Sequence, residues 1–230
     1  MTEMHADEAV VKVPSIFKRL IDVFVRPAEL FDTLKDRPVW GGALVLGAVL
    51  VVASMLAIPA DVWTEMFRAS MADQPDAAEA MEGVGTTLMR VFAVGGGFVF
   101  WAVWTFLVAG VATLAFAFFM GDEGKFKQYL SVTCHALLIA AVGGLLITPL
   151  RIAQANPQLT LSLGTFLPAG DSYFHRFLSG LDLFMIWGYV VLAIGASRID
   201  TRRSVMSATV VMMLFVLVTT ALFALVPSPA

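Results

Sequence analysis

Charged residues and cysteine are scarce in this chain of 230 residues, and each shortage excludes a class of protein. Only 14% of the residues are charged and 59% are hydrophobic, whereas a soluble domain carries about 25% charged residues. A soluble protein would need the missing charge to cover its surface, but a protein that faces lipid does not. The single cysteine, Cys134, excludes a disulfide framework within the chain. The net charge of −3 excludes a strongly basic, nucleic-acid-binding surface.

The signature motifs of common enzymes and metal sites are also missing. The sequence has no His-Glu-x-x-His zinc motif and no Gly-x-Ser-x-Gly nucleophile motif. The segment Gly121-Asp-Glu-Gly-Lys125 lacks the spacing of a phosphate loop and the Ser or Thr after its lysine. The acidic residues of the stretch 59–89 do not follow the pattern of a calcium loop. We therefore expect no enzymatic activity, no metal ion and no cofactor.

Long apolar stretches are what the sequence does contain. A helix needs about 20 apolar residues to cross the hydrocarbon layer of a membrane, and five stretches approach that length. They are Val39–Ile58, Gly96–Met120, Leu130–Leu150, Leu178–Ser197 and Val205–Val226. The sequence therefore predicts an all-α membrane protein with five transmembrane helices.

The residues before the first apolar stretch divide into two parts. Residues 1–14 are polar and lack the apolar core of a cleavable signal peptide. Within residues 15–36, apolar side chains recur at helical spacing, with Lys18, Arg19 and Asp22 opposite them. This pattern predicts an amphipathic helix lying on the cytoplasmic membrane surface, followed by a second short helix that starts at Pro27. Residues 37–230 form the predicted transmembrane domain.

The distribution of lysine and arginine predicts the orientation, because cytoplasmic flanks carry the excess of both. One set of flanks contains eleven such residues and the other contains four. The larger set is Lys12, Lys18, Arg19, Arg26, Lys35, Arg37, Lys125, Lys127, Arg198, Arg202 and Arg203, and the smaller is Arg68, Arg90, Arg151 and Arg176. We therefore expect a cytoplasmic N-terminus and a C-terminus outside.

A few polar side chains in or beside the spans are candidates for function. Asp182 is predicted one turn inside the fourth span, where a carboxylate is costly. It could pair with Arg151 or Arg90 near the outer surface, line an ion or substrate path, or be solvated at the interface. His135 is predicted one turn inside the third span, too far in depth from Asp182 to form a proton relay with it. A packing role, with a hydrogen bond to a neighbouring backbone or hydroxyl group, is the favoured interpretation.

Small residues recur every fourth position on the second and third spans, and such ridges let membrane helices approach closely. The first ridge is Thr105, Ala109, Thr113 and Ala117, and the second is Ala136, Ala140, Gly144 and Thr148. The short turn at residues 121–129 makes the two spans antiparallel neighbours, so we hypothesise that the ridges pack against each other. The alternative is that they reflect only the abundance of small residues in membrane helices.

Three stretches resemble the Yip1 family. They are Arg26-Pro-Ala-Glu-Leu-Phe leading to Arg37-Pro-Val-Trp40, Gly121-Asp-Glu-Gly-Lys-Phe-Lys-Gln-Tyr-Leu-Ser131, and Leu178-Ser-Gly-Leu-Asp-Leu-Phe-Met-Ile-Trp187. The resemblance covers about Phe17 to Val226 and implies five spans with a cytoplasmic N-terminus. Eukaryotic relatives act in Golgi and endoplasmic reticulum traffic, bind Rab-type GTPases and associate with each other. They carry a long polar N-terminal region that this chain lacks, so a Rab-type partner is not expected.

The sequence therefore favours a non-enzymatic membrane scaffold of the compact, bacterial Yip1 type, in the inner (cytoplasmic) membrane. Expected partners are membrane lipids and either a second copy or another membrane protein, with no nucleic acid. The alternative is a transporter, channel or lipid-translocating protein, for which Asp182, His135 and the polar Thr and Ser residues of the second and third spans are the supporting features. A hydrated cavity reaching Asp182 would favour the alternative, and a dry bundle with an exposed apolar face would favour the scaffold.

Overall fold

The computed structural model describes residues 13–70, 85–156, 159–168, 170 and 172–226, and this part of the chain is helical apart from its loops and one isolated β-bridge. Two short helices come first, α1 (Ile16–Val25) and α2 (Pro27–Leu34), separated only by Arg26. Pro27 occupies the first position of α2, where its missing N–H costs no hydrogen bond. The sequence therefore locates both short helices correctly.

Apolar helices form the body of the molecule. In chain order they are α3 (Gly41–Ala57), α6 (Thr86–Thr113) continued by the π-helix η1 (Leu114–Phe119), α7 (Phe126–Ala136) with α8 (Leu138–Ala153), α10 (Leu183–Ile199) and α11 (Val205–Phe223). By length and composition, three of these segments are candidate membrane spans: Arg90–Phe119, Phe126–Ala153 and Val205–Phe223. The remaining two, α3 and α10, are apolar but have 17 residues each.

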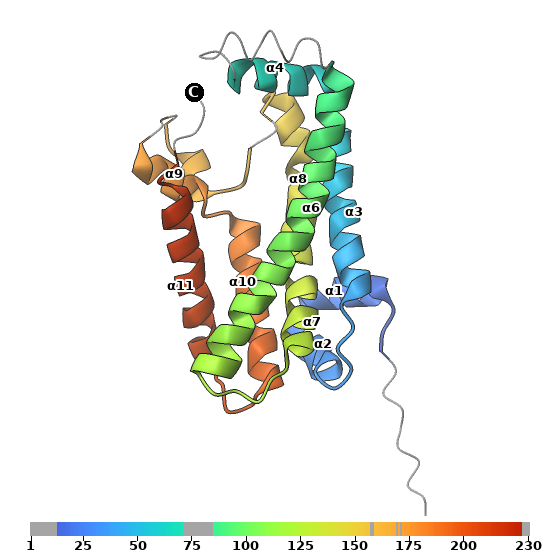
Figure 1. The fold of residues 1–230 in the computed structure, drawn as a ribbon, viewed down its shortest axis with the longest axis vertical. Helices are drawn as coiled ribbons and strands as arrows, with labels where there is room; N and C mark the ends of the chain where they lie inside the picture. The colour runs from blue at the N-terminus through green and yellow to red at the C-terminus, as the bar shows by residue number, and fades with distance from the viewer. Residues whose placement is uncertain (1–12, 71–84, 157–158, 169, 171, 227–230) are drawn as a thin grey trace, which may run out of the picture.

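The second apolar segment begins earlier than the hydropathy pattern predicts. Its helix starts at Thr86 rather than near Gly96, and it continues unbroken through the three consecutive glycines at 95–97. Hydropathy marks where a helix becomes apolar, and the helix itself continues for as long as the backbone remains regular. In Figure 1, α6 runs obliquely across the other helices from the end at α4 (Ala60–Ser70).

The segment α7–α8 is the most enclosed of the three candidate spans. Of its most apolar stretch, 72% is buried, compared with 28% for α6–η1 and 22% for α11. Close backbone approach explains how its neighbours reach it: a Cβ added at Gly188 of α10 would lie 3.1 Å from the carbonyl oxygen of Ala136. A Cβ at Gly195 or Gly143 would collide with the side chains of Val132 or Phe184. The centre of the bundle is therefore closely packed.

The ends of the bundle differ in the elements that they carry (Figure 1). At the end we call the α1–α2 end lie α1, α2 and the connections at residues 120–125 and 200–204. At the opposite end, which we call the α4–α9 end, lie α4, the 3₁₀-helix η2 (Leu163–Phe166) and α9 (Tyr173–Ser179). The described residues of the connection between α8 and α9 include η2, and Ser162 of this connection forms the isolated bridge with Asp182.

Candidate functional site

A buried contact between Arg19 and His135 joins α1 to the third apolar segment. Only 8% of Arg19 is exposed, and its Nη1 lies 2.9 Å from Nε2 of His135. The Nε of the same guanidinium donates to the Pro14 carbonyl at 3.0 Å. His135 is fully buried, and its Nδ1 lies 2.7 Å from the Ser131 carbonyl, one turn earlier in α7. The pair links residues that are 116 positions apart in the sequence.

The hydrogen-bond partners determine the state of the imidazole. A carbonyl oxygen only accepts, so Nδ1 of His135 carries the proton that is donated to Ser131, and Nε2 is left as an acceptor. The guanidinium of Arg19 supplies the matching donor. Burial lowers the pKa of Arg19 from its usual value, but an arginine stays protonated in proteins. The contact is therefore a charge-assisted hydrogen bond to a neutral histidine, which holds α1 on the bundle.

The buried position of Arg19 corrects the predicted faces of α1. The helical pattern assigned Arg19 to the polar face with Lys18 and Asp22, but Arg19 and Val23 are the buried residues of this helix. Three apolar side chains that are spaced one helical turn apart point outward instead. Their exposed fractions are 71% for Phe17, 62% for Ile21 and 67% for Val25. The reason is that His135 provides an acceptor for the guanidinium inside the bundle.

Ion pairs and a backbone hydrogen bond hold the two connections together at the α1–α2 end. Arg203 Nη2 lies 2.6 Å from Asp122 Oδ1, and the two side chains are 17% and 2% exposed. Arg202 pairs with Asp200, whose carboxylate also accepts the backbone N–H of Glu123 at 3.1 Å.

The hydrogen bond from Arg202 is the main cause that holds the pKa of Asp200 well below its usual value. The residues of these two pairs were not singled out from the sequence. The available signal was an aspartate within three residues of the end of each of two apolar helical segments, on the side richest in arginine.

Asp182 lies just before α10, not one turn inside a span as predicted. It is the N-cap residue of α10, and its Oδ1 accepts the Met185 N–H at 2.8 Å. This hydrogen bond satisfies one of the otherwise unpaired N–H groups in the first turn. The backbone next to Asp182 also forms a hydrogen bond across the isolated β-bridge: the Leu183 N–H donates to the Leu161 carbonyl at 3.0 Å. The carboxylate is thus engaged in the local fold of the α4–α9 end.

The two arginines proposed as partners of Asp182 bind backbone carbonyls. Arg151 Nε donates to the Leu159 carbonyl at 2.8 Å. Arg90 Nη2 donates to the carbonyls of Leu56 and Ile58. Within the described residues, neither arginine lies within 4.0 Å of the Asp182 carboxylate. His135 lies against α1, whereas Asp182 lies at the start of α10, where it pairs with Ser162 next to η2.

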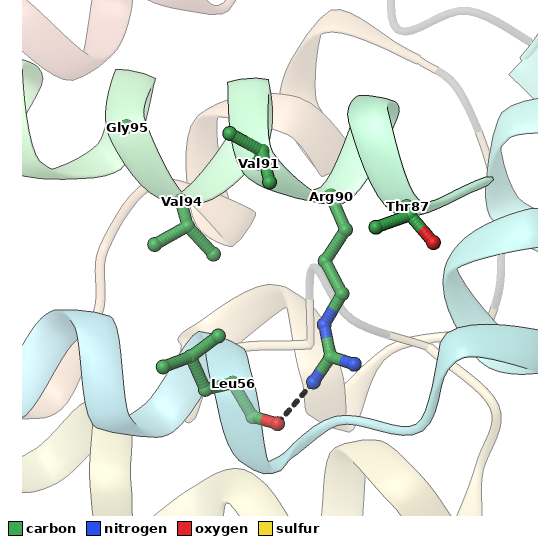
Figure 2. Close-up of a pocket in the computed structure, with 6 residues that line it drawn as sticks. All are labelled: Leu56, Thr87, Arg90, Val91, Val94 and Gly95. Carbon is green, nitrogen blue, oxygen red and sulfur yellow. Dashed lines mark hydrogen bonds between the residues drawn. The ribbon is translucent and has the colours of Figure 1, made fainter. Parts of the chain in front are cut away.

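Arg90 also lines a groove between the last turn of α3 and the first turns of α6, shown in Figure 2. The groove has a volume of about 440 Å³, and its other lining residues are Leu56, Thr87, Val91, Val94 and Gly95. Figure 2 shows the Arg90 side chain reaching from α6 to the Leu56 carbonyl on α3. Arginine here supplies donors to carbonyls that the end of α3 leaves unpaired.

The small residues of the two ridges fall into different parts of the core. Ala109 packs in a cluster with Leu130 and Cys134, whereas Ala136 belongs to the cluster that includes Tyr189 of α10. Thr105 and Thr148 are buried, and Thr113, Ala117, Ala140 and Gly144 are partly buried. Thr105, Thr113 and Thr148 each donate to a carbonyl one turn earlier. α6 packs against α7, while α8 lies chiefly against α3 and α10.

Much of the acidic stretch 59–89 lies outside the described residues, including Asp73, Asp76, Glu79 and Glu82. Within the described part of the chain, no group of three or more His, Cys, Asp or Glu side chains is placed to hold a metal ion.

Comparison with known proteins identifies the family. The family model described as the Yip1 domain matches residues 21–226. The chain is also similar to Membrane protein YknW of Bacillus subtilis (strain 168), with 28% identity over 189 residues that cover 80% of this chain and 78% of that protein. No solved structure matches the chain. The family match spans most of the chain and agrees with the apolar helices of the fold, so the chain belongs to the Yip1 family of membrane proteins.

Proposed function

We propose that the protein is a multi-pass membrane scaffold of the bacterial inner membrane, with five spans and a cytoplasmic N-terminus. Three apolar segments are long enough to cross a membrane. The 17 residues of α3 or α10 rise about 25 Å at 1.5 Å per residue, somewhat less than the roughly 30 Å of the hydrocarbon layer. Apolar flanking residues and slight thinning of the bilayer make up the difference at modest cost.

The observation that carries the scaffold proposal is the attachment of α1 to a closed bundle. Arg19 and His135 fix the helix from inside, while Phe17, Ile21 and Val25 face outward. A helix held in this way offers a fixed apolar surface at the cytoplasmic face, suited to a membrane or protein contact. The close approach of α7, α8 and α10 at Gly143, Gly188 and Gly195 favours a rigid support beneath it.

The residues that favoured a transporter serve local structure. Asp182 caps α10, and His135 binds Arg19 and Ser131. In proteoliposomes, we expect neither proton, cation nor lipid flux above the protein-free rate, and no change with Asp182→Asn. A flux that Asp182→Asn abolishes while the variant unfolds at the parent temperature would establish the alternative function.

Crosslinking in native membranes tests the scaffold role. A photoreactive amino acid replaces Ile21 or Met206, whose side chains are 62% and 75% exposed, or the fully buried controls Val23 and Met212. A scaffold predicts discrete protein adducts from at least one exposed position and none from the buried position of the same helix. Adducts to lipid alone from both exposed positions would contradict a protein-organising role.

The topology rests on the charge distribution and has its own test. With Cys134 replaced, single cysteines at Ser15, Gln74, Lys125, Gln158 and Pro229 are treated with a thiol reagent that does not cross membranes. We expect labelling from outside at Gln74, Gln158 and Pro229 only, because the eleven-to-four split places the other two in the cytoplasm. Labelling of Lys125 from outside in intact cells would contradict the proposed orientation.

A further inference from the structure

The groove at the α4–α9 end combines an apolar lining with one cation. Five of its six lining residues are uncharged, and Arg90 is the sixth (Figure 2). Its volume of about 440 Å³ falls within the roughly 300–1,000 Å³ of small-molecule sites. The rim is open to the surroundings of the bundle, since Leu56 is 51% exposed and Val91 is 60% exposed. An occupant must therefore be largely apolar and reach the groove from the side of the bundle.

The guanidinium of Arg90 has hydrogen-bonding capacity that the protein does not use. Both carbonyl contacts, to Leu56 and Ile58, are made by Nη2. Its Nη1 is not buried and makes no hydrogen bond in the described part of the chain, and its buried Nε has no acceptor there either. No carboxylate of the described residues lies within ion-pair distance of Arg90. The positive charge at the groove is thus matched by backbone dipoles but by no described anion.

We propose that this groove binds one anionic phospholipid, with an acyl chain against Leu56, Val91 and Val94 and the phosphate on Arg90. A guanidinium binds phosphate oxygens through charge-assisted hydrogen bonds, and the lipid charge complements the unmatched arginine. Arg90 lies near the start of α6, beside α4, as a headgroup position requires, and the groove extends from it along the apolar part of α6. The site does not depend on whether the protein is a scaffold or a transporter.

The chain offers matched variants that separate the groove from its surroundings. A Cβ added at Gly95 or at Gly96 meets no neighbour within 4 Å, but only Gly95 lines the groove. Gly95→Leu therefore fills the groove without colliding with the core, and Gly96→Leu is its control. Arg90→Gln removes the cation, and Arg151→Gln is its control, since Arg151 also donates to a carbonyl but does not line the groove.

The experiment is native mass spectrometry of the full chain in mild detergent with added phosphatidylglycerol, and with the uncharged lipid diacylglycerol in parallel. We expect the parent, Gly96→Leu and Arg151→Gln to retain one phosphatidylglycerol molecule. Gly95→Leu and Arg90→Gln should each weaken its binding about tenfold or more, as the loss of a charge-assisted contact or of the space predicts. Diacylglycerol should bind the parent at least about tenfold more weakly.

Three results would overturn the site. If all variants retain the lipid as the parent does, the lipid lies elsewhere on the surface. If Gly96→Leu loses it together with Gly95→Leu, the effect belongs to the helix and not to the groove. If diacylglycerol binds as tightly as phosphatidylglycerol, Arg90 does not select a phosphate.

Discussion

The two ends of the bundle use arginine in different ways. In the connections at the α1–α2 end, two arginines pair with carboxylates: Arg203 with Asp122, and Arg202 with Asp200. At the α4–α9 end, arginines donate to backbone carbonyls near helix ends. Arg90 donates to the carbonyls of Leu56 and Ile58, and Arg151 donates to the carbonyl of Leu159.

The two kinds of arginine contact hold different parts of the chain together. The pair of Arg203 and Asp122 joins two connections whose residues lie 81 positions apart, and the Asp200 carboxylate held by Arg202 joins them again through the Glu123 N–H. These carbonyl contacts of Arg90 and Arg151 stay within one end of the bundle: Arg90 binds carbonyls at the end of α3, which lack intrahelical partners, and Arg151 binds a loop carbonyl eight positions later in the chain. The first kind of contact responds to pH, because carboxylates titrate, and the second does not. The α1–α2 end is therefore the one whose stability should depend on charge.

The largest expected effect comes from breaking the buried pair at the α1–α2 end. Arg203→Gln leaves the Asp122 carboxylate, which is 2% exposed, without its cation. Removing one partner of a buried ion pair costs about 3–5 kcal/mol, so we expect a loss of that order in the free energy of unfolding in detergent. Asp122→Asn in the same chain should restore part of the loss. Equal destabilisation by Arg151→Gln at the other end would remove the distinction between the two ends.

A smaller effect is expected from packing. Ala109→Leu inserts a larger side chain beside Leu130 and Cys134, where Ala109 is fully buried, and overpacking of this kind costs about 1–3 kcal/mol. Gly144→Leu is the matched change on the third segment, and a Cβ there meets no neighbour within 4 Å. Thermal unfolding in detergent should show Ala109→Leu clearly destabilised and Gly144→Leu near the parent. Similar losses for both variants would refute this difference in packing.

The pH dependence of the same end should be the most modest effect. Arg202 lowers the pKa of Asp200 in the folded protein, while unfolding returns it to its usual value of about 3.9. The unfolded chain therefore takes up the proton first, and the stabilisation by Asp200 is present above about pH 4 and lost as the pH falls further. The stability difference between the parent and Asp200→Asn should shrink between about pH 6 and pH 3. A difference that stays constant over this range would contradict the assignment.

The sequence predicts the helices of this fold better than the contacts between them. Hydropathy locates the apolar segments, and Pro27 marks the start of α2. Periodicity alone could not place Arg19 inside, because its partner His135 lies 116 residues away. Similarly, hydropathy extended the fourth span back to Leu178, although Gly180 ends α9 and Asp182 caps α10. Closer attention to capping residues would have recovered that boundary.

The polar groups at the α1–α2 end illustrate the same limit. Asp122 and Asp200 follow two different spans, and only the fold brings each to its arginine: Arg203 of the other connection for Asp122, and the neighbouring Arg202 for Asp200. The groove at Arg90 was equally inaccessible to sequence reasoning, because it depends on where α3 ends relative to the first turns of α6. Contacts between distant segments follow from packing, which a single sequence does not specify.

The attachment of α1 by Arg19 is the central claim, and the native cysteine reports on it. Cys134 is fully buried next to His135, and Ile16 and Leu20 of α1 pack against its cluster. Arg19→Gln shortens the donor that reaches His135, and weakening the attachment by about 1.4 kcal/mol would raise the detached population about tenfold. The exposed pair of Lys18 and Asp22 makes Lys18→Gln the control, since such pairs contribute about 0–1 kcal/mol.

The decisive measurement is the rate at which a membrane-permeant maleimide modifies Cys134 in the folded protein. The account predicts slow modification in the parent and in Lys18→Gln, and modification about tenfold faster in Arg19→Gln. Equal rates in all three proteins, with the unfolding temperature of Arg19→Gln unchanged, would show that Arg19 does not hold α1 on the bundle.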